Sequence, residues 1–139
     1  DRVTAEDLPY IISDVLNRGS IHEKIKIKSY YLKHKKNEKP SADVKIEIEG
    51  MTYSEKGIGD GQFDAFMNAV KKLYKKNGYS LPLLTDYSVT IPPGSHSDAL
   101  CETLITWKNS EKEFITRGLD SDQTVSAIKA TEKMLNIII

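Results

Sequence analysis

The chain has 139 residues, enough for one domain with a real core, since about 68% of the unfolded surface is hidden on folding at this size. Its 20 basic and 20 acidic side chains cancel, which leaves no electrostatic footprint for nucleic acid or an anionic membrane surface. No apolar run is long enough to cross a membrane, and the single cysteine, Cys101, excludes an internal disulfide and suits a reducing cytoplasm.

The first predicted element is a short helix within residues 1–21. Thr4 is a suitable N-cap, acidic residues follow it in the first turn, and Gly19 marks the end. An apolar stripe at helical spacing lies between them, formed by Leu8, Ile11, Ile12, Val15 and Leu16. Because the chain begins at Asp1 without an initiator methionine or a signal-like apolar run, we expect a fragment of a longer protein that starts with a linker helix.

A strand and a long helix come next, joined by a glycine-rich loop. In "ADVKIEIEG" the residues Val44, Ile46 and Ile48 alternate with charged residues, which is the period of a half-buried strand. The segment 62–77 then carries one apolar helical face, made of Phe63, Phe66, Met67, Val70, Leu73 and Tyr74. Gly78 stands where this helix is predicted to stop.

An internal repeat with a spacing of 61 residues organises the rest of the chain. It carries Gly57 onto Gly118 and Val44 onto Ile105. It also predicts a second helix that starts near Asp122, with the inner face Ala127, Ile128, Thr131, Met134 and Leu135. The opening strands match only with a slip to 62, which sets Ile25, Ile27 and Ser29 against Tyr87, Val89 and Ile91.

Each half is therefore strand, strand, strand, helix, over about residues 22–78 and 83–139. Two such halves predict an α+β fold of two pseudo-symmetric βββα units, antiparallel sheets with helices packed against them, preceded by the short linker helix. This order of elements offers no βαβ unit, which argues against a nucleotide-binding enzyme built on the glycines.

The loop "GIGDGQ" at 57–62 has three glycines directly before the first long helix. It matches neither the dinucleotide fingerprint, whose third glycine comes one residue later, nor a P-loop, which needs lysine after its last glycine. A helix start presents unpaired backbone N–H groups and a positive dipole end, so the loop favours a bound carboxylate. The alternative is a plain turn and cap, with Gln62 and Gln123 closing capping boxes at the two helix starts.

No catalytic or metal-binding constellation is found in the sequence. The histidines His22, His34 and His96 are far apart, and no pair of them has metal-ligand spacing. Cys101 lies in an alternating strand and is expected to be a buried, inert thiol. The residues alone favour a binding module over an enzyme, with no metal or cofactor in this chain.

Four stretches carry a resemblance to a known family: "GIGDGQFDAFMNAV", "LLTDYSV", "DALCETLITW" and "ITRGLDSDQTVSAIKATEKMLN". Over about residues 22–139 the chain resembles the C-terminal regulatory domain of 2-isopropylmalate synthase and its close relative citramalate synthase. The usual loop of that family is G-x-G-P-hydrophobic-D-A, and here Gln62 and Phe63 stand in its proline and hydrophobic positions. The N-terminal helix is similar to the end of the linker subdomain that precedes this domain.

The resemblance implies an allosteric domain of a larger acyltransferase. It implies a homodimer and a pocket near the dimer interface for a branched-chain amino acid, which feeds back on a catalytic barrel of the same chain. The parent would condense acetyl-CoA with 2-oxoisovalerate in leucine biosynthesis, in the cytoplasm, with a divalent metal held by the barrel. Neither that metal nor a catalytic residue is expected in this chain. The apolar C-terminal "LNIII", which should be partly buried, also favours a homodimer.

Carried over residue by residue, the resemblance implies an effector pocket in two parts. The first part is the helix start after the glycine loop, with Gly59, Gly61, Phe63 and Asp64. The second part lies on strands of the second half, with Leu84, Tyr87, Ile91 and Cys101. The helix end would take the carboxylate of the effector, Asp64 its ammonium group and the apolar set its side chain. The alternative for Leu84, Ile91 and Cys101 is ordinary core.

Leucine is the favoured effector. Cys101 is smaller than valine and leaves depth for a side chain that branches far from its α-carbon. Two alternatives stay open: an isoleucine-sensing regulatory domain of a citramalate synthase, and a purely structural dimerisation module.

Overall fold

The structure is a computed structural model of the chain, and it describes residues 23–91 and 100–139. The chain forms two compact units, Glu23–Leu81 and a second unit that includes Pro82–Ile139, and each unit is described by itself. The helix predicted within residues 1–21, together with His22 and His96, lies outside the described residues.

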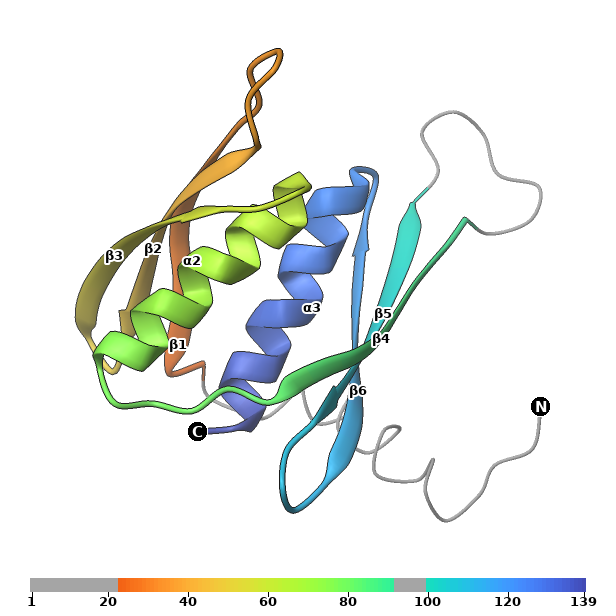
Figure 1. Ribbon diagram of the computed structural model, residues 1–139. Helices are drawn as coiled ribbons and strands as arrows, with labels where there is room; N and C mark the ends of the chain where they lie inside the picture. The colour runs from red at the N-terminus through yellow and green to blue at the C-terminus, as the bar shows by residue number, and fades with distance from the viewer. Residues whose placement is uncertain (1–22, 92–99) are drawn as a thin grey trace. The chain divides into compact units, whose positions relative to one another are not determined.

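The unit Glu23–Leu81 is a three-stranded antiparallel sheet with one helix packed on it (Figure 1). Its strands are β1 (Ile25–Lys33), β2 (Ser41–Ile48) and β3 (Met51–Ile58), in that order across the sheet, and its helix is α2 (Gln62–Lys76). Alternation along β2 buries Val44 and Ile46, which are at most 1% exposed. The predicted half-buried strand is therefore confirmed.

Helix α2 ends at Lys76, one residue before the predicted end, and Gly78 follows its C-cap, Asn77, as the sequence predicts. Gly78 has a φ of +80°, a left-handed conformation that glycine adopts without steric cost. Its N–H donates to the Lys75 carbonyl at 3.2 Å, and the Tyr79 N–H donates to the Tyr74 carbonyl at 2.9 Å. These bonds satisfy carbonyl groups of the last helical turn and lead the chain away from the helix.

The second unit has the same architecture. Its strands are β4 (Leu83–Thr90), β5 (Cys101–Lys108) and β6 (Glu113–Asp120), and its helix is α3 (Gln123–Ile137). The largest buried side chain is Trp107, whose indole N–H donates to the Thr116 hydroxyl at 2.8 Å. A tryptophan can be fully buried here because its one polar atom has a partner.

The two helices confirm the 61-residue spacing, since α2 and α3 begin and end 61 residues apart. Matching positions share an environment: Ala69 and Ala130 are both 0% exposed, and Gly57 and Gly118 each face the backbone of the following helix. The predicted fold class, an α+β protein of two βββα units, is confirmed.

The slip of 62 predicted for the opening strands is wrong. In the ladder between β1 and β2, Tyr30 lies opposite Val44. In the ladder between β4 and β5, Tyr87 lies opposite Ile105, which is the repeat partner of Val44. Tyr30 and Tyr87 are therefore equivalent, at a spacing of 57 residues.

The error arises because the connection between the first two strands has four more residues in the second unit, and a β-bulge in each unit concealed this difference. The ladder of each unit is irregular at the same place. Lys28 in β1 and Thr85 in β4 have no residue opposite them on the neighbouring strand. An extra residue shifts the alternation of all later side chains by one. The slip of 62 therefore matched Ile25 and Ile27, which precede the bulge of β1, with Tyr87 and Val89, which follow the bulge of β4, and all four lie opposite buried residues.

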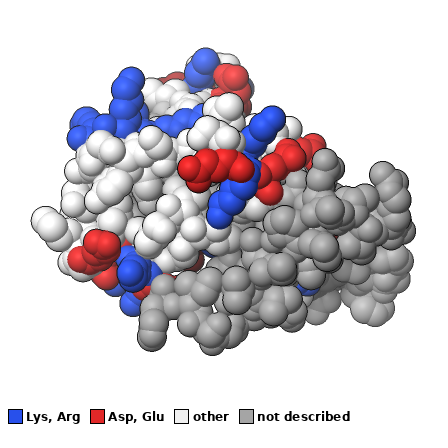
Figure 2. Space-filling view, turned by 90° about the horizontal axis from the view of Figure 1, so that it is seen from below, with Lys and Arg blue, Asp and Glu red and all other residues white. Residues whose placement is uncertain are grey.

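The C-terminal isoleucines are partly covered. Ile137 and Ile138 are half-buried, whereas Ile139 is 55% exposed. On the face shown in Figure 2, basic side chains lie beside acidic ones around a mainly uncharged area. No helix in the described part of the chain has the length and apolar character needed to span a membrane.

Candidate functional site

The eight predicted site residues fall into two sets, one in each unit. The first set lies at the start of α2: Gly59, Gly61, Phe63 and Asp64. The second set lies on or beside β4 and β5: Leu84, Tyr87, Ile91 and Cys101. The structure groups the residues within each set, and the sets are described one at a time.

The three glycines before α2 serve different purposes, and packing requires two of them. A Cβ on Gly57 would lie 2.4 Å from the Ala65 carbonyl oxygen, and one on Gly59 would lie 2.5 Å from the Ala65 backbone nitrogen. Both distances are shorter than a Cβ tolerates, so the chain passes the helix only without side chains there. Nothing lies within 4 Å of the corresponding position on Gly61. Packing therefore does not explain the third glycine.

Gly61 leaves the start of α2 without a side-chain cap. It is the N-cap residue, its backbone is extended with φ −136° and ψ 174°, and no side chain at this position bonds to the helix. The N-cap of α3 is Asp122, whose carboxylate accepts the Val125 N–H at 3.0 Å. The place that a side-chain carboxylate takes at α3 is thus open at α2.

The capping boxes that the alternative interpretation assigned to Gln62 and Gln123 do not form. A capping box needs its glutamine at the third helical position, and both glutamines occupy the first. The third residue of α2 is Asp64, which accepts the Asp60 N–H at 2.9 Å. Asp64 therefore closes back over the loop and binds the residue just before the N-cap.

Further contacts fix the loop between β3 and α2. The Gly59 N–H donates to the Pro40 carbonyl at 3.1 Å. From the second turn of α2, the Asn68 side-chain amide donates to the Ile58 carbonyl at 2.7 Å. Together with the Asp64 contact, these hydrogen bonds engage one backbone group of each residue from 58 to 60. These hydrogen bonds give the loop a defined conformation.

Phe63 belongs to an aromatic cluster at the same helix start. Its ring stacks on that of Phe66, with centroids 6.0 Å apart, and Phe66 in turn meets the edge of Tyr30 at 6.2 Å. Phe66 is fully buried, whereas Tyr30 keeps 37% of its surface exposed. The cluster makes the surroundings of the open helix start apolar.

In the second set, Leu84 and Tyr87 share the sheet face that carries α3. They lie opposite Trp107 and Ile105, which are fully buried on that face. Helix α3 packs mainly on β6 and β5, so the face of β4 is incompletely covered. Leu84 is 40% exposed and Ile91, one step beyond the strand, is 60% exposed. Neither is the ordinary core residue of the alternative interpretation.

Tyr87 is tied to the start of α3. Burial raises the pKa of its phenol, and a hydrogen bond with the Gln123 side chain partly opposes that rise. The ring therefore presents an apolar face from β4 while its hydroxyl group already has a partner.

Cys101 is half-buried, whereas the strand pattern predicted a buried thiol. Its sulfur lies 3.9 Å from the Ser121 carbonyl oxygen, the range of a weak S–H donor. Continued along β4, the register that pairs Val89 with Thr103 brings Ile91 to the level of Cys101. Together with Val89, which lies between Tyr87 and Ile91 on β4, the second set forms an apolar strip along the incompletely covered face.

Two residues of the α2 site escaped the sequence-based prediction. Tyr30 was missed because the slip of 62 matched Tyr87 with a different residue of β1. Asn68 was missed because its partner is a backbone carbonyl, which leaves no mark on the sequence. The spacing of 61 could have indicated Asn68, because this spacing relates Asn68 to Lys129, which makes the same contact in the other unit.

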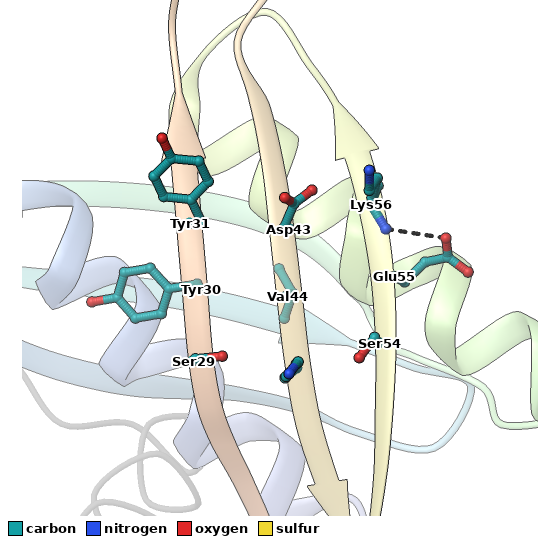
Figure 3. Close-up of a pocket in the computed structure, with 9 residues that line it drawn as sticks. Ser29, Tyr30, Tyr31, Asp43, Val44, Ser54, Glu55 and Lys56 are labelled. Atoms are coloured by element: carbon teal, nitrogen blue, oxygen red, sulfur yellow. Dashed lines mark hydrogen bonds between the residues drawn. The ribbon is translucent and has the colours of Figure 1, made fainter.

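A shallow hollow of about 560 Å³ lies on the sheet of the first unit (Figure 3). Two rows of side chains cross its three strands there, one formed by Tyr31, Asp43 and Lys56 and the next by Ser29, Lys45 and Ser54. None of the eight predicted site residues lines it. The described ranges also contain no group of three or more His, Cys, Asp or Glu side chains placed to hold a metal ion.

Comparisons with known proteins identify one matching family and several relatives. The sequence model of a family described as "LeuA allosteric (dimerisation) domain" matches residues 2–139. The chain is 29% identical over 137 residues to "Putative (R)-citramalate synthase CimA" of Archaeoglobus fulgidus, which covers 99% of this chain and 27% of that protein. It is 29% identical over 131 residues to the 2-isopropylmalate synthase of Methylorubrum populi, which covers 94% and 24%.

A third relative is the 2-isopropylmalate synthase of Clostridium acetobutylicum, 30% identical over 117 residues, which covers 77% of this chain and 20% of that protein. The chain thus spans about a quarter of the length of the relatives that it matches.

Proposed function

The chain belongs to the LeuA allosteric (dimerisation) domain family, and we propose that it is the feedback-regulatory domain of a 2-isopropylmalate synthase, with leucine as its effector. The names of two relatives support the parent enzyme. For that parent we propose the condensation of acetyl-CoA with 2-oxoisovalerate, in the cytoplasm, with a divalent metal held by a catalytic barrel outside this chain.

The contrast between the two helix starts carries the proposal. At α3 a carboxylate from Asp122 already occupies the helix N-terminus, whereas at α2 Gly61 leaves that place open. Backbone N–H groups and the positive end of the helix dipole favour an anion there. An amino acid supplies such an anion as its α-carboxylate.

We propose that residues of the two sets bind the other groups of the amino acid. Asp64, an exposed carboxylate in the first turn of α2, is the group that we assign to the ammonium of the effector. We assign its branched side chain to the apolar strip of Leu84, Tyr87, Ile91 and Cys101, which α3 leaves partly uncovered.

We also propose that the domain is a homodimer and that the strip on β4 lies close to the contact between copies. Exposed apolar side chains in one row are typical of an interface. Allosteric control further requires two states of the whole enzyme, of which this domain biases one or the other.

A citramalate synthase regulated by isoleucine is the second candidate, favoured by the match of 99% of this chain to a protein with that name. Leucine and isoleucine contain the same atoms, so carboxylate and ammonium contacts cannot separate them. Only the apolar walls can, and a misplaced methyl group changes binding by about 1–3 kcal/mol.

Thermal unfolding of the chain with and without each branched-chain amino acid tests the proposal. A ligand that binds only the folded state stabilises it by about 2.7 kcal/mol at a hundred times its dissociation constant. We expect a rise in Tm with leucine. If no branched-chain amino acid shifts the Tm, the purely structural dimerisation module is the better description.

A further inference from the structure

In each unit a side chain of the helix donates a hydrogen bond to a backbone carbonyl of the preceding loop or strand end, and we call this contact the clamp. Asn68 Nδ2 donates to the Ile58 carbonyl at 2.7 Å in the first unit, and Lys129 Nζ donates to the Leu119 carbonyl at 3.1 Å in the second. The two pairs are related by the 61-residue spacing, although asparagine and lysine differ in shape and charge. Both units therefore have a side-chain donor in the second turn of the helix and a backbone acceptor near the end of the third strand.

Beyond the clamp the two loops differ. In the second loop, Asp120 pairs with Lys129 at 3.0 Å and accepts the Asp122 N–H at 2.8 Å, while Asp122 caps the helix. The repeat positions of these two acids are the glycines Gly59 and Gly61 in the first loop. The first loop therefore has the matching hydrogen bond from its helix to a strand carbonyl, but none of its side chains caps the helix.

We infer that Asn68 is a positioning residue for the effector site. It holds the Ile58 carbonyl so that the loop 58–61 already has the conformation in which the start of α2 is open to a carboxylate. A site that is ordered beforehand does not lose conformational freedom when its ligand arrives, which strengthens binding. This inference rests on the proposed effector site, and Asn68 acts through the loop rather than on the ligand.

The fold does not depend on this contact. The hydrogen bond is exposed to solvent and Ile58 itself is 64% exposed, so water can replace the amide when Asn68 is shortened. The contact adds order to the loop more than it adds stability to the unit. Loss of Asn68 should therefore loosen the loop in a protein that still folds.

The test compares three variants of the 139-residue chain with the unchanged chain. Asn68→Ala removes the donor, Asn68→Lys restores one by copying the second unit, and Lys129→Ala removes the matched donor from the loop without an open helix start. Titration calorimetry with leucine and isoleucine measures affinity. Hydrogen exchange of the Gly59 and Asp60 amides, without ligand, measures the order of the loop.

We expect Asn68→Ala to raise the Kd of both amino acids about two- to tenfold, the range for one lost hydrogen bond, and to speed exchange at Asp60. Asn68→Lys should restore slow exchange, and Lys129→Ala should leave the Kd unchanged. An unchanged Kd for Asn68→Ala, or an equal loss for Lys129→Ala, overturns the inference. If the unchanged chain binds neither amino acid, the proposed function fails, and the exchange rates alone decide whether Asn68 orders the loop.

Discussion

The backbone nitrogen of Ala69 lies 2.4 Å from the place that a Cβ on Gly57 would take, so α2 touches β3 with no side chain between them. Gly118 and Ala130 repeat the relationship at 2.8 Å in the second unit. The two glycines that share the 61-residue spacing thus set how closely each helix approaches its sheet.

Gly57→Ala and Gly118→Ala should each destabilise the protein, because the atoms that a new methyl group meets are backbone and cannot move aside. Overpacking of this kind costs about 1–3 kcal/mol or more. Denaturant unfolding monitored by circular dichroism measures the change. Gly61→Ser is the matched control, since nothing lies within 4 Å of its Cβ position, and it should cost nothing. Equal losses for Gly57→Ala and Gly61→Ser would contradict the packing argument.

Gly61→Asp should weaken effector binding while the fold is retained. It gives α2 the cap that Asp122 gives α3, so the new carboxylate occupies the helix start and repels an anion. We expect the Kd for leucine to rise at least about tenfold in calorimetry, with stability unchanged or higher by a few tenths of a kcal/mol.

The control for that variant is Asp122→Ala in the second unit. It should lower the free energy of unfolding by about 1 kcal/mol, the usual value of an N-cap, without any change in leucine affinity. A loss of affinity here would mean that the second helix start also takes part in binding.

Asp64 can be tested for two roles at once. Asp64→Ala should weaken leucine and isoleucine alike, since both carry the same ammonium group. Asp64→Asn keeps an acceptor for the Asp60 N–H, so affinity should recover only if the loop contact at 2.9 Å is all that matters. We expect no recovery, and an affinity unaffected by Asp64→Ala would refute the ammonium contact.

Leucine should bind more tightly than isoleucine in the same titrations, and Cys101→Val should change the ratio of the two affinities. The added methyl groups fill the depth that a side chain branching late would use. Tighter binding of isoleucine by the unchanged chain would favour the citramalate synthase alternative.

Leu84→Asp should weaken the dimer, because it places a charge on the incompletely covered face of β4. Leu83→Asp is the matched control, on the adjacent residue, which faces the opposite side of the sheet and is 71% exposed. Light scattering at micromolar concentration should report a monomer only for Leu84→Asp. A monomeric unchanged chain would rule out the proposed homodimer.

Acid should destabilise the first unit partly through Glu55. Hydrogen bonds from the Lys76 ammonium and then from the Lys56 N–H lower the pKa of its carboxyl group from the ordinary 4.5. A lowered pKa in the folded state adds stability above pH 4.5 that is lost as the pH falls through the folded value. The Tm of Glu55→Gln should therefore fall less than that of the unchanged chain below that pH, and Lys76→Met should flatten the profile in the same way.

Much of the fold was predictable because its signals are local and repeated. The apolar face of α2 and the alternation around Val44 follow from spacing alone, and the second unit shows both again. The end of α2 before Gly78 follows from the glycine itself. The opening strands were not predictable in this way, since a bulge at Lys28 and at Thr85 breaks the alternation that the prediction used.

The site was predictable only in part, because its decisive contacts join side chains to backbone groups. The open position at Gly61 could be suspected from the glycine pattern, yet that Gly57 and Gly59 serve packing becomes visible only beside the helix. The contacts of Asn68 and Lys129 have the same geometry with different chemistry, so no comparison of residue types would pair them.

The tyrosines Tyr30 and Tyr87 are 57 residues apart, whereas Val44 and Ile105, which lie opposite them, are 61 apart. The second repeat therefore has four more residues between its first and second strands. From the second strand to the end of the helix, equivalent positions of the two repeats keep a constant spacing of 61 residues. The first connection is thus where the repeat tolerates a change of length, and the exposed turn at Lys35–Glu38 is a place to insert a peptide tag or a fluorophore without disturbing the packed helix.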